Sequence, residues 1–185
     1  MNIEVRPALC KGLPEDLLGT VSDLAETLRR WTYVNCWHLN PHESGAMWKL
    51  YSRSQEAIAI QTTYEKLQGV LPQEVILGPV AYLDYRVELA PDEDCLSRFF
   101  CRPKFFEYEH EVRAAIQDFP RSQAFFKQNP DMGKSIPVDV EKLIEIVRVA
   151  PDSPQWYLDL VQEVTRKYRI SLLVQRSSMD DPAFF

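Results

Sequence analysis

The chain is poor in glycine, and its few glycines are scattered. Six occur among 185 residues, and they are not clustered into the glycine-rich loop that cradles a phosphate in ATP-binding and Rossmann-type proteins. The sequence also lacks a Gly-x-Ser-x-Gly turn, and its cysteines lie in no local motif typical of a catalytic thiol. These absences argue against ATP-driven chemistry, Rossmann-type chemistry and hydrolysis by a serine or cysteine nucleophile.

Long apolar runs, a basic surplus and paired cysteines are also missing. No stretch approaches the roughly 20 apolar residues of a membrane span, and the first residues lack the pattern of a signal peptide. A net charge of −6 offers no general attraction for the phosphates of nucleic acid. The four cysteines contain no Cys-x-x-Cys pair, and we expect them to be reduced and buried. The sequence therefore predicts a cytoplasmic protein that binds neither membranes nor nucleic acid.

The composition that remains is that of one globular domain. A hydrophobic content of 45% with 26% charged residues fits a chain that buries a core, and 185 residues fit a single domain. We expect residues 1–185 to form that domain, with an N-terminal helix region (1–30), a main body (31–179) and a short tail (180–185).

Helical and strand-like patterns alternate along the chain. Helical spacing of apolar residues occurs at residues 13–30 and from Ser153 onward, where one stripe contains Trp156, Tyr157, Leu160, Val161, Val164 and Tyr168. Strand-like runs occur at residues 33–39, 56–63, 74–89, 110–119, 135–140 and 170–175, with shorter helices between them. Pro79 lacks an N–H, which predicts a bulge or an edge position for its strand.

The fold class that these patterns predict is α+β. We expect a twisted mixed sheet of about five to seven strands with several short helices. The core residues that we expect are Val34, Ile58, Ile60, Val80, Val112, Ile116, Ile146, Trp156, Leu160 and Leu172.

Several stretches together resemble a bacterial protein family of unknown function. In chain order they are VNCWHLNPHESGAMWKLYS with EAIAIQTTYEKL, then GPVAYLDY, RPKFFEYEHEVRAAI, GKSIPVDVEKLIEIVRVAPDSPQWYLDLV and LLVQRSSM, over most of residues 33–179. Members of that family usually carry an additional N-terminal strand and helix that this chain lacks. The resemblance therefore implies an incomplete site, a shortened domain or a partner that supplies the missing part.

The segment EYEHEVRAAI places charged residues at alternate positions. On a strand, Glu109, Glu111 and Arg113 share one face, where Arg113 would hold Glu111 ionised and the two carboxylates would raise each other's pKa. Two interpretations are open. The segment is the solvated face of an antiparallel strand with ordinary ion pairs, or it is a carboxylate pair that performs acid–base chemistry.

The second interpretation draws on a further resemblance, to ADP-ribosyltransferases. These enzymes place a Glu-x-Glu at the start of a strand late in a small α+β domain. The resemblance implies that Glu111 is the catalytic carboxylate, which holds the nicotinamide ribose of NAD, and that Glu109 assists it. His38 would replace, by residue type, the basic residue that opens the transferase pattern. The residues expected to bind the nucleotide are Arg113, Tyr51, Trp48, Trp37, Thr62 and His38.

Other functions remain open at this point. Cys36, His38 and His42 lack a fourth zinc ligand, and we expect no metal there. Asp84 could join Glu109 and Glu111 in a magnesium-dependent nuclease, which the acidic composition disfavours. The main alternative is a non-catalytic module whose aromatic surface binds another protein or a second copy. If relatives use the N-terminal strand to extend the sheet, its loss leaves an edge or a groove beside residues 33–39. We expect the helix at residues 13–30 to cover it, with self-association as the alternative.

Overall fold

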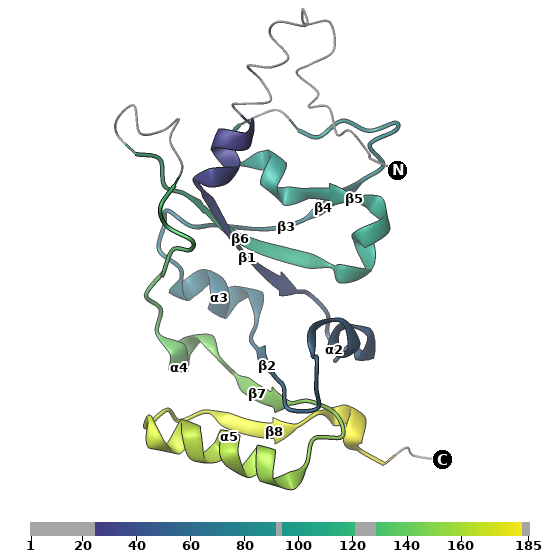
Figure 1. The fold of residues 1–185 in the computed structure, drawn as a ribbon, viewed down its shortest axis with the longest axis vertical. Helices are drawn as coiled ribbons and strands as arrows, with labels where there is room; N and C mark the ends of the chain where they lie inside the picture. Colours follow the sequence, from purple (N-terminus) through teal and green to yellow (C-terminus); the bar gives the residue numbers. More distant parts are fainter. Residues whose placement is uncertain (1–24, 92–93, 121–128, 183–185) are drawn as a thin grey trace, which may run out of the picture. The chain divides into compact units, whose positions relative to one another are not determined.

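The computed structural model describes residues 25–91, 94–120 and 129–182 (Figure 1). The chain divides into two compact units, and each is described by itself. Unit 1 comprises Met1–Leu39 and Gln73–Ser135, and unit 2 comprises Asn40–Pro72 and Ile136–Phe185. Helices and strands occur in both, which confirms the α+β class. That residues 1–185 fold as one domain stays a prediction. In the described part of the chain, every helix is too short or too polar to cross a membrane.

Unit 1 is built around strand β6, which lies between two antiparallel neighbours in the order β1-β6-β3. A parallel pair, β4 and β5, and two 3-10 helices complete the unit. The bounds are β1 (Thr32–His38), β3 (Ile76–Pro79), β4 (Ala81–Leu83), η2 (Ser97–Phe100), β5 (Cys101–Pro103), η3 (Lys104–Glu109) and β6 (Glu111–Gln117). Pro79 ends an edge strand, as its missing N–H predicts.

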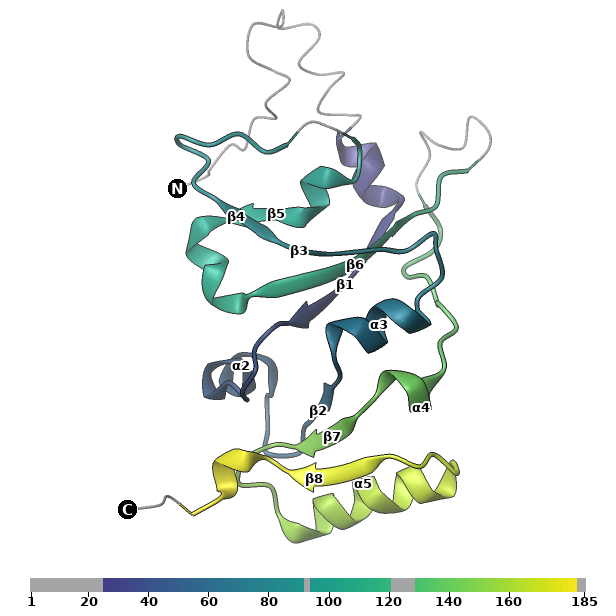
Figure 2. The ribbon, with the colours of Figure 1, turned by 180° about the vertical axis from the view of Figure 1, so that it is seen from behind.

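Unit 2 contains a second three-stranded sheet, in the order β2-β7-β8. Strands β7 and β8 are parallel, so helix α5 makes the crossover between them, and both views show it running beside β8 (Figures 1 and 2). The bounds are α2 (Gly45–Tyr51), β2 (Ile58–Gln61), α3 (Tyr64–Val70), α4 (Val140–Leu143), β7 (Ile146–Val149), α5 (Gln155–Lys167), β8 (Leu173–Arg176) and η5 (Ser178–Asp180).

The sheet arrangement differs from the prediction. The described residues form two three-stranded sheets and one two-stranded sheet, in place of a single mixed sheet of five to seven strands. The strand-like runs were recognised correctly in most cases, but hydrophobic pattern does not say which run pairs with which. Residues 135–140 were wrongly predicted as a strand, and the helix α4 begins at Val140 instead.

The core differs from the predicted set and includes residues of both middle strands. Val112 and Ala115 of β6 and Val147 and Val149 of β7 are buried, together with the predicted Val80. Five predicted core residues are instead exposed: Val34, Ile58, Ile60, Trp156 and Leu160. The reason for the first three is that β1 and β2 are edge strands, so only one neighbour shields their side chains.

Two further predictions concern the N-terminal helix and the cysteines. Residues 25–30 are helical, and the rest of the helix predicted at residues 13–30 lies outside the described residues, as does Cys10. Strand β1 lies at an edge of its sheet, as predicted. The three cysteines that the structure describes are free, but Cys36 and Cys95 are exposed where burial was expected.

Candidate carboxylate–arginine site

The carboxylate pair lies where η3 passes into β6. Helix η3 ends at Glu109, and β6 begins at Glu111. Between them, His110 adopts the left-handed conformation, with φ 41° and ψ 54°, which is uncommon for a residue other than glycine. Glu109 was predicted to lie on the strand, but it is the last residue of η3. The turn at His110 nevertheless keeps both carboxylates in contact with the same arginine, Arg102.

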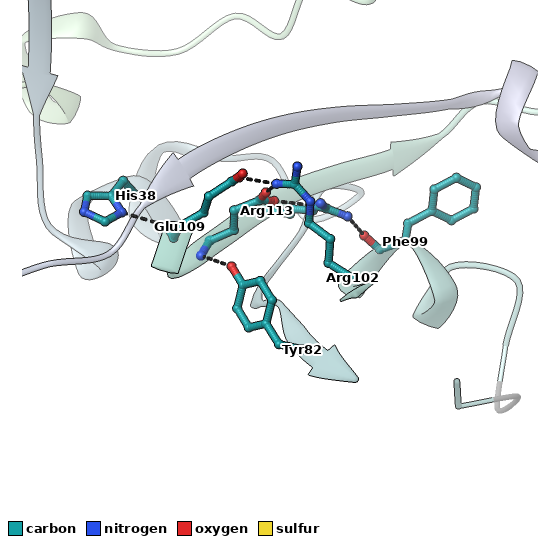
Figure 3. A network of polar contacts seen from close by, with 7 residues as sticks. His38, Tyr82, Phe99, Arg102, Glu109 and Arg113 are labelled. Carbon is teal, nitrogen blue, oxygen red and sulfur yellow. Dashed lines mark hydrogen bonds and ion pairs between the residues drawn. The ribbon is translucent and has the colours of Figure 1, made fainter. Parts of the chain in front are cut away.

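Both carboxylates are buried and held by arginines. Glu109 is 5% exposed and Glu111 is 6% exposed, so the interpretation as a solvated strand face is wrong. Arg102 Nη1 donates to a carboxylate oxygen of each (Figure 3). Arg113 Nε donates to Glu111 Oε2 at 2.6 Å, as its position on the strand predicted, and Arg113 Nη1 donates to the carbonyl of Phe99.

The main chain and an aromatic ring fix this cluster in place. The N–H of Glu111 donates to the hydroxyl of Tyr82 at 2.6 Å, and the carbonyl of Glu111 accepts from the N–H of Val80 at 2.9 Å. Arg102 stacks on Phe106, with its guanidinium carbon 4.1 Å from the ring centroid. Glu111 is thus held through its side chain and through both polar groups of its backbone.

The two carboxyl groups have opposite pKa shifts. Burial raises the pKa of Glu109, and its hydrogen bond to Glu111 raises it further, against the effect of Arg102. Burial would also raise the pKa of Glu111, but hydrogen bonds from Arg113 and from Glu109 lower it below its ordinary value. The shifts differ in direction because the hydrogen bonds from Arg113 and Glu109 favour the ionised form of Glu111, whereas burial favours the neutral form of Glu109.

His38, on the neighbouring strand β1, contacts the same cluster. It is the register partner of Glu111 across β1 and β6, and its Nδ1 donates to the carbonyl of Glu109 at 2.6 Å. This bond fixes the tautomer and leaves a lone pair on Nε2 in the neutral ring. Among the residues that the structure describes, His38 Nε2 and Trp37 Nε1 are the buried side-chain polar atoms without a hydrogen-bond partner.

The residues predicted for the site fall into two groups. Unit 1 holds Glu109, Glu111, Arg113 and His38 in one cluster, and Trp37 is on β1 with its side chain on the opposite face of the sheet from His38.

Trp48, Tyr51 and Thr62 belong to unit 2. Trp48 Nε1 donates to Glu43 at 3.1 Å, and Thr62 Oγ1 donates to the carbonyl of Leu143. Within their unit, Trp48 and Thr62 therefore have structural contacts of their own, while Tyr51 is exposed.

Arg102 and Tyr82 were missed by the sequence analysis. A charge argument could have found Arg102, because two buried carboxylates require more than one cation, and Arg102 and Lys104 both precede them closely. Lys104 is exposed and pairs with Glu107, which leaves Arg102. No sequence signal indicates that the Tyr82 hydroxyl accepts a backbone N–H.

The proposed nuclease triad does not assemble. The carboxylate of Asp84 is half-buried and pairs with Arg86 at 2.6 Å, and this pairing lowers its pKa to about 2. Among the described residues, no group of three or more histidine, cysteine, aspartate or glutamate side chains is placed to hold a metal ion.

Unit 2 contains another carboxylate that is largely shielded from water, that of Glu43. Its Oε2 accepts from Trp48 Nε1 and from Ser177 Oγ at 2.6 Å, and its Oε1 accepts from the N–H and the hydroxyl of Ser178. Arg148 Nε lies 3.6 Å from Oε1. Burial alone would raise the pKa of Glu43, but these hydrogen bonds, with that of Ser177 first, lower it.

Comparison of the chain with protein-family models, with curated proteins and with solved structures finds no match. The site must therefore be interpreted from its own geometry.

Proposed function

We propose that the carboxylate–arginine cluster of unit 1 binds a nucleotide diphosphate, with NAD as the substrate of an ADP-ribosyltransferase-type reaction. The observation that supports this most is the convergence of His38 and Glu111, two residues far apart in the sequence, as register partners at one strand end. The same few residues include the buried unpaired Nε2 of His38 and the left-handed His110. Unsatisfied buried atoms, backbone strain and shifted carboxyl groups tend to gather at functional sites.

Guanidinium chemistry points to a phosphate ligand, and exposure points to Arg102 as the residue that meets it. The guanidinium groups of Arg102 and Arg113 converge on this cluster, and such groups bind phosphate oxygens in a bidentate manner. The side chain of Arg102 is 26% exposed, against 6% for each carboxylate, so Arg102 is the cover that can turn outward. When it turns to a pyrophosphate, it uncovers Glu111 for a ribose hydroxyl, and the unpaired Nε2 of His38 is available to a second polar group of the ligand.

The reaction that fits this arrangement is transfer at the ribose carbon that bears nicotinamide. The bond from that carbon to the nicotinamide nitrogen breaks, and its electron pair leaves with the neutral ring. An acceptor oxygen or nitrogen forms the new bond and gives up its proton to solvent. Glu111, whose pKa is lowered, stabilises the positive charge that develops on the ribose, and the hydrogen bond from Glu109 favours the ionised form of Glu111.

The test is a titration of NAD, ADP and AMP into the full chain, observed by saturation-transfer NMR, with released nicotinamide measured by chromatography. We expect saturable binding of NAD in the millimolar range or below, weakened at least about tenfold by Arg102→Gln. Glu111→Gln should abolish nicotinamide release while retaining part of the binding. Lys104→Gln is the matched control, because Lys104 is an exposed cation two residues from Arg102.

The alternative function is a non-catalytic interaction module, and it has its own observation. Large apolar side chains of α5 in unit 2 are exposed, including Trp156 and Tyr168. Absence of saturable binding for all three nucleotides at millimolar concentration would overturn the transferase proposal and favour the interaction module. Binding of NAD that Arg102→Gln leaves unchanged would move the nucleotide site elsewhere in the chain.

A further inference from the structure

Helix α5 carries an apolar ridge that faces solvent along its whole length. The ridge consists of Trp156, Leu160, Val164 and Tyr168, which follow one another at intervals of four residues. Their exposed fractions are 53%, 47%, 45% and 68%, although the sequence pattern predicted a buried stripe. The less exposed part of the helix surface is instead the adjacent row, which includes Tyr157 and Val161. The side chains of these two residues are half-buried.

The ridge is ordered rather than a loose set of side chains. Trp156 packs edge-on against Tyr157, with ring centroids 5.7 Å apart and an interplanar angle of 83°. Tyr168 caps the helix, and its N–H still donates to the carbonyl of Val164 at 3.1 Å. Aromatic anchors at both ends of a ridge of this kind are typical of residues that dominate protein interfaces.

The order of residues along the ridge is symmetric. Aromatic residues stand at both ends and branched aliphatic residues in the middle, so an antiparallel copy of the ridge places Trp156 against the copy of Tyr168 and Leu160 against the copy of Val164. Rows of residues spaced by four form the ridges that interdigitate in the commonest helix packing, at a crossing angle of about −50°. A ridge that complements itself in this way meets the requirement of a two-fold interface.

The charges beside the ridge have the same symmetry. Asp159, Glu163 and Lys167 form the next row, also at intervals of four, on the side away from the half-buried row. In the antiparallel arrangement, Asp159 faces the copy of Lys167 at each end. Glu163 faces its own copy at the centre, but Arg166 of the same helix already neutralises it. In a parallel two-fold arrangement, the charged row of each helix would instead lie beside the half-buried row of the other, so Asp159 would not meet the copy of Lys167.

We propose that the α5 ridge is a dimerisation surface and that its partner is a second copy of this chain, bound antiparallel. The inference is independent of the chemistry proposed at Glu111. Four side chains from each copy make a small interface, so we expect a reversible dimer with a dissociation constant on the order of 10 µM.

The test is sedimentation equilibrium of the full chain over a concentration series that spans this value. Leu160→Lys should raise the dissociation constant at least about tenfold, because it places a charge in the centre of the apolar interface. Leu50→Lys is the matched control, since Leu50 is also an exposed leucine, on α2 of the same unit. Far-UV circular dichroism verifies that both variants fold.

Charge exchange at exposed positions tests the orientation without touching the apolar ridge. Asp159→Lys alone and Lys167→Asp alone should each weaken the dimer several-fold, and the double variant Asp159→Lys/Lys167→Asp should restore it. A parallel dimer would not show this restoration. A chain that stays monomeric at concentrations well above the expected constant overturns the proposal, and so does a dimer that Leu160→Lys leaves intact.

Discussion

Glu43 in unit 2 and the Glu109–Glu111 pair in unit 1 are both carboxylates withdrawn from water, but they are held by different groups. Glu43 accepts hydrogen bonds from an indole, two hydroxyls and a backbone N–H, with one arginine further away. The Glu109–Glu111 pair is held mainly by the guanidinium groups of Arg102 and Arg113.

The difference separates a structural tie from a candidate site. Neutral donors satisfy Glu43 without adding charge, and they join the start of α2 to Ser177 and Ser178 after β8, two segments far apart in the sequence. The cluster of unit 1 has two guanidinium groups, two carboxyl groups with opposite pKa shifts and a partly exposed arginine, all of which a ligand can exploit.

The largest effect should come from Glu111→Gln. The substitution removes the carboxylate that pairs with both Arg102 and Arg113, and losing one member of a buried ion pair costs about 3–5 kcal/mol of unfolding free energy. Urea unfolding followed by tryptophan fluorescence measures this loss. Glu107→Gln removes the exposed partner of Lys104 and should change the value by no more than about 0.5 kcal/mol. Equal losses in the two variants would contradict the ionic account of the cluster.

A smaller effect, with a distinct pH dependence, should follow from Glu43→Gln. At neutral pH we expect a loss of about 1.5–3 kcal/mol, the range for hydrogen bonds to a charged group. The pKa of Glu43 is lowered from 4.5 in the folded protein, so its contribution is fully present above that value and is lost as the pH falls below it. Unfolding free energies of the wild type and the variant should therefore converge in acid.

The matched control for this pH dependence is Glu56→Gln, which changes an exposed carboxylate of the same unit. Its difference from the wild type should stay small at every pH. A difference between wild type and Glu43→Gln that is constant from neutral to acid pH would show that the network does not depend on the ionised carboxylate.

The smallest effect should come from Tyr82→Phe. It removes only the hydroxyl that accepts from the N–H of Glu111, so we expect a loss of about 1 kcal/mol in urea unfolding. Tyr108→Phe is the control at an exposed tyrosine of the same unit. A loss as large as that of Glu111→Gln would mean that Tyr82 supports the whole cluster rather than one bond.

Local features of the fold were predictable because they depend on nearby residues. Ser44 and Thr63 cap α2 and α3 through their hydroxyl groups, and the apolar spacing after Ser153 marks α5 within two residues of its start. The association of strands into separate sheets depends on distant pairing, which pattern does not encode. For the same reason, the exposure of Trp156 and Leu160 was not predictable, since an apolar stripe does not specify what covers it.

The candidate site was predictable only in part. Glu111 and Arg113 are two residues apart, so strand geometry alone brings them together. His38 was selected by residue type, and its position opposite Glu111 comes from the β1–β6 register, which joins residues about seventy positions apart. The burial of the pair and the bridging position of Arg102 depend on η3 and β5, whose short lengths give little periodic signal.

The left-handed turn at His110 also bears on how such sites are recognised in other sequences. The middle residue of Glu-x-Glu has a left-handed backbone here, so the two glutamates flank a turn. The middle position therefore tolerates only residues that enter the left-handed region at low cost. Glycine, asparagine, aspartate and histidine meet this condition, whereas valine, isoleucine and threonine do not. A sequence with a β-branched residue between its two glutamates would place them as ordinary strand residues, and a search for sites of this type can exclude it by that one position.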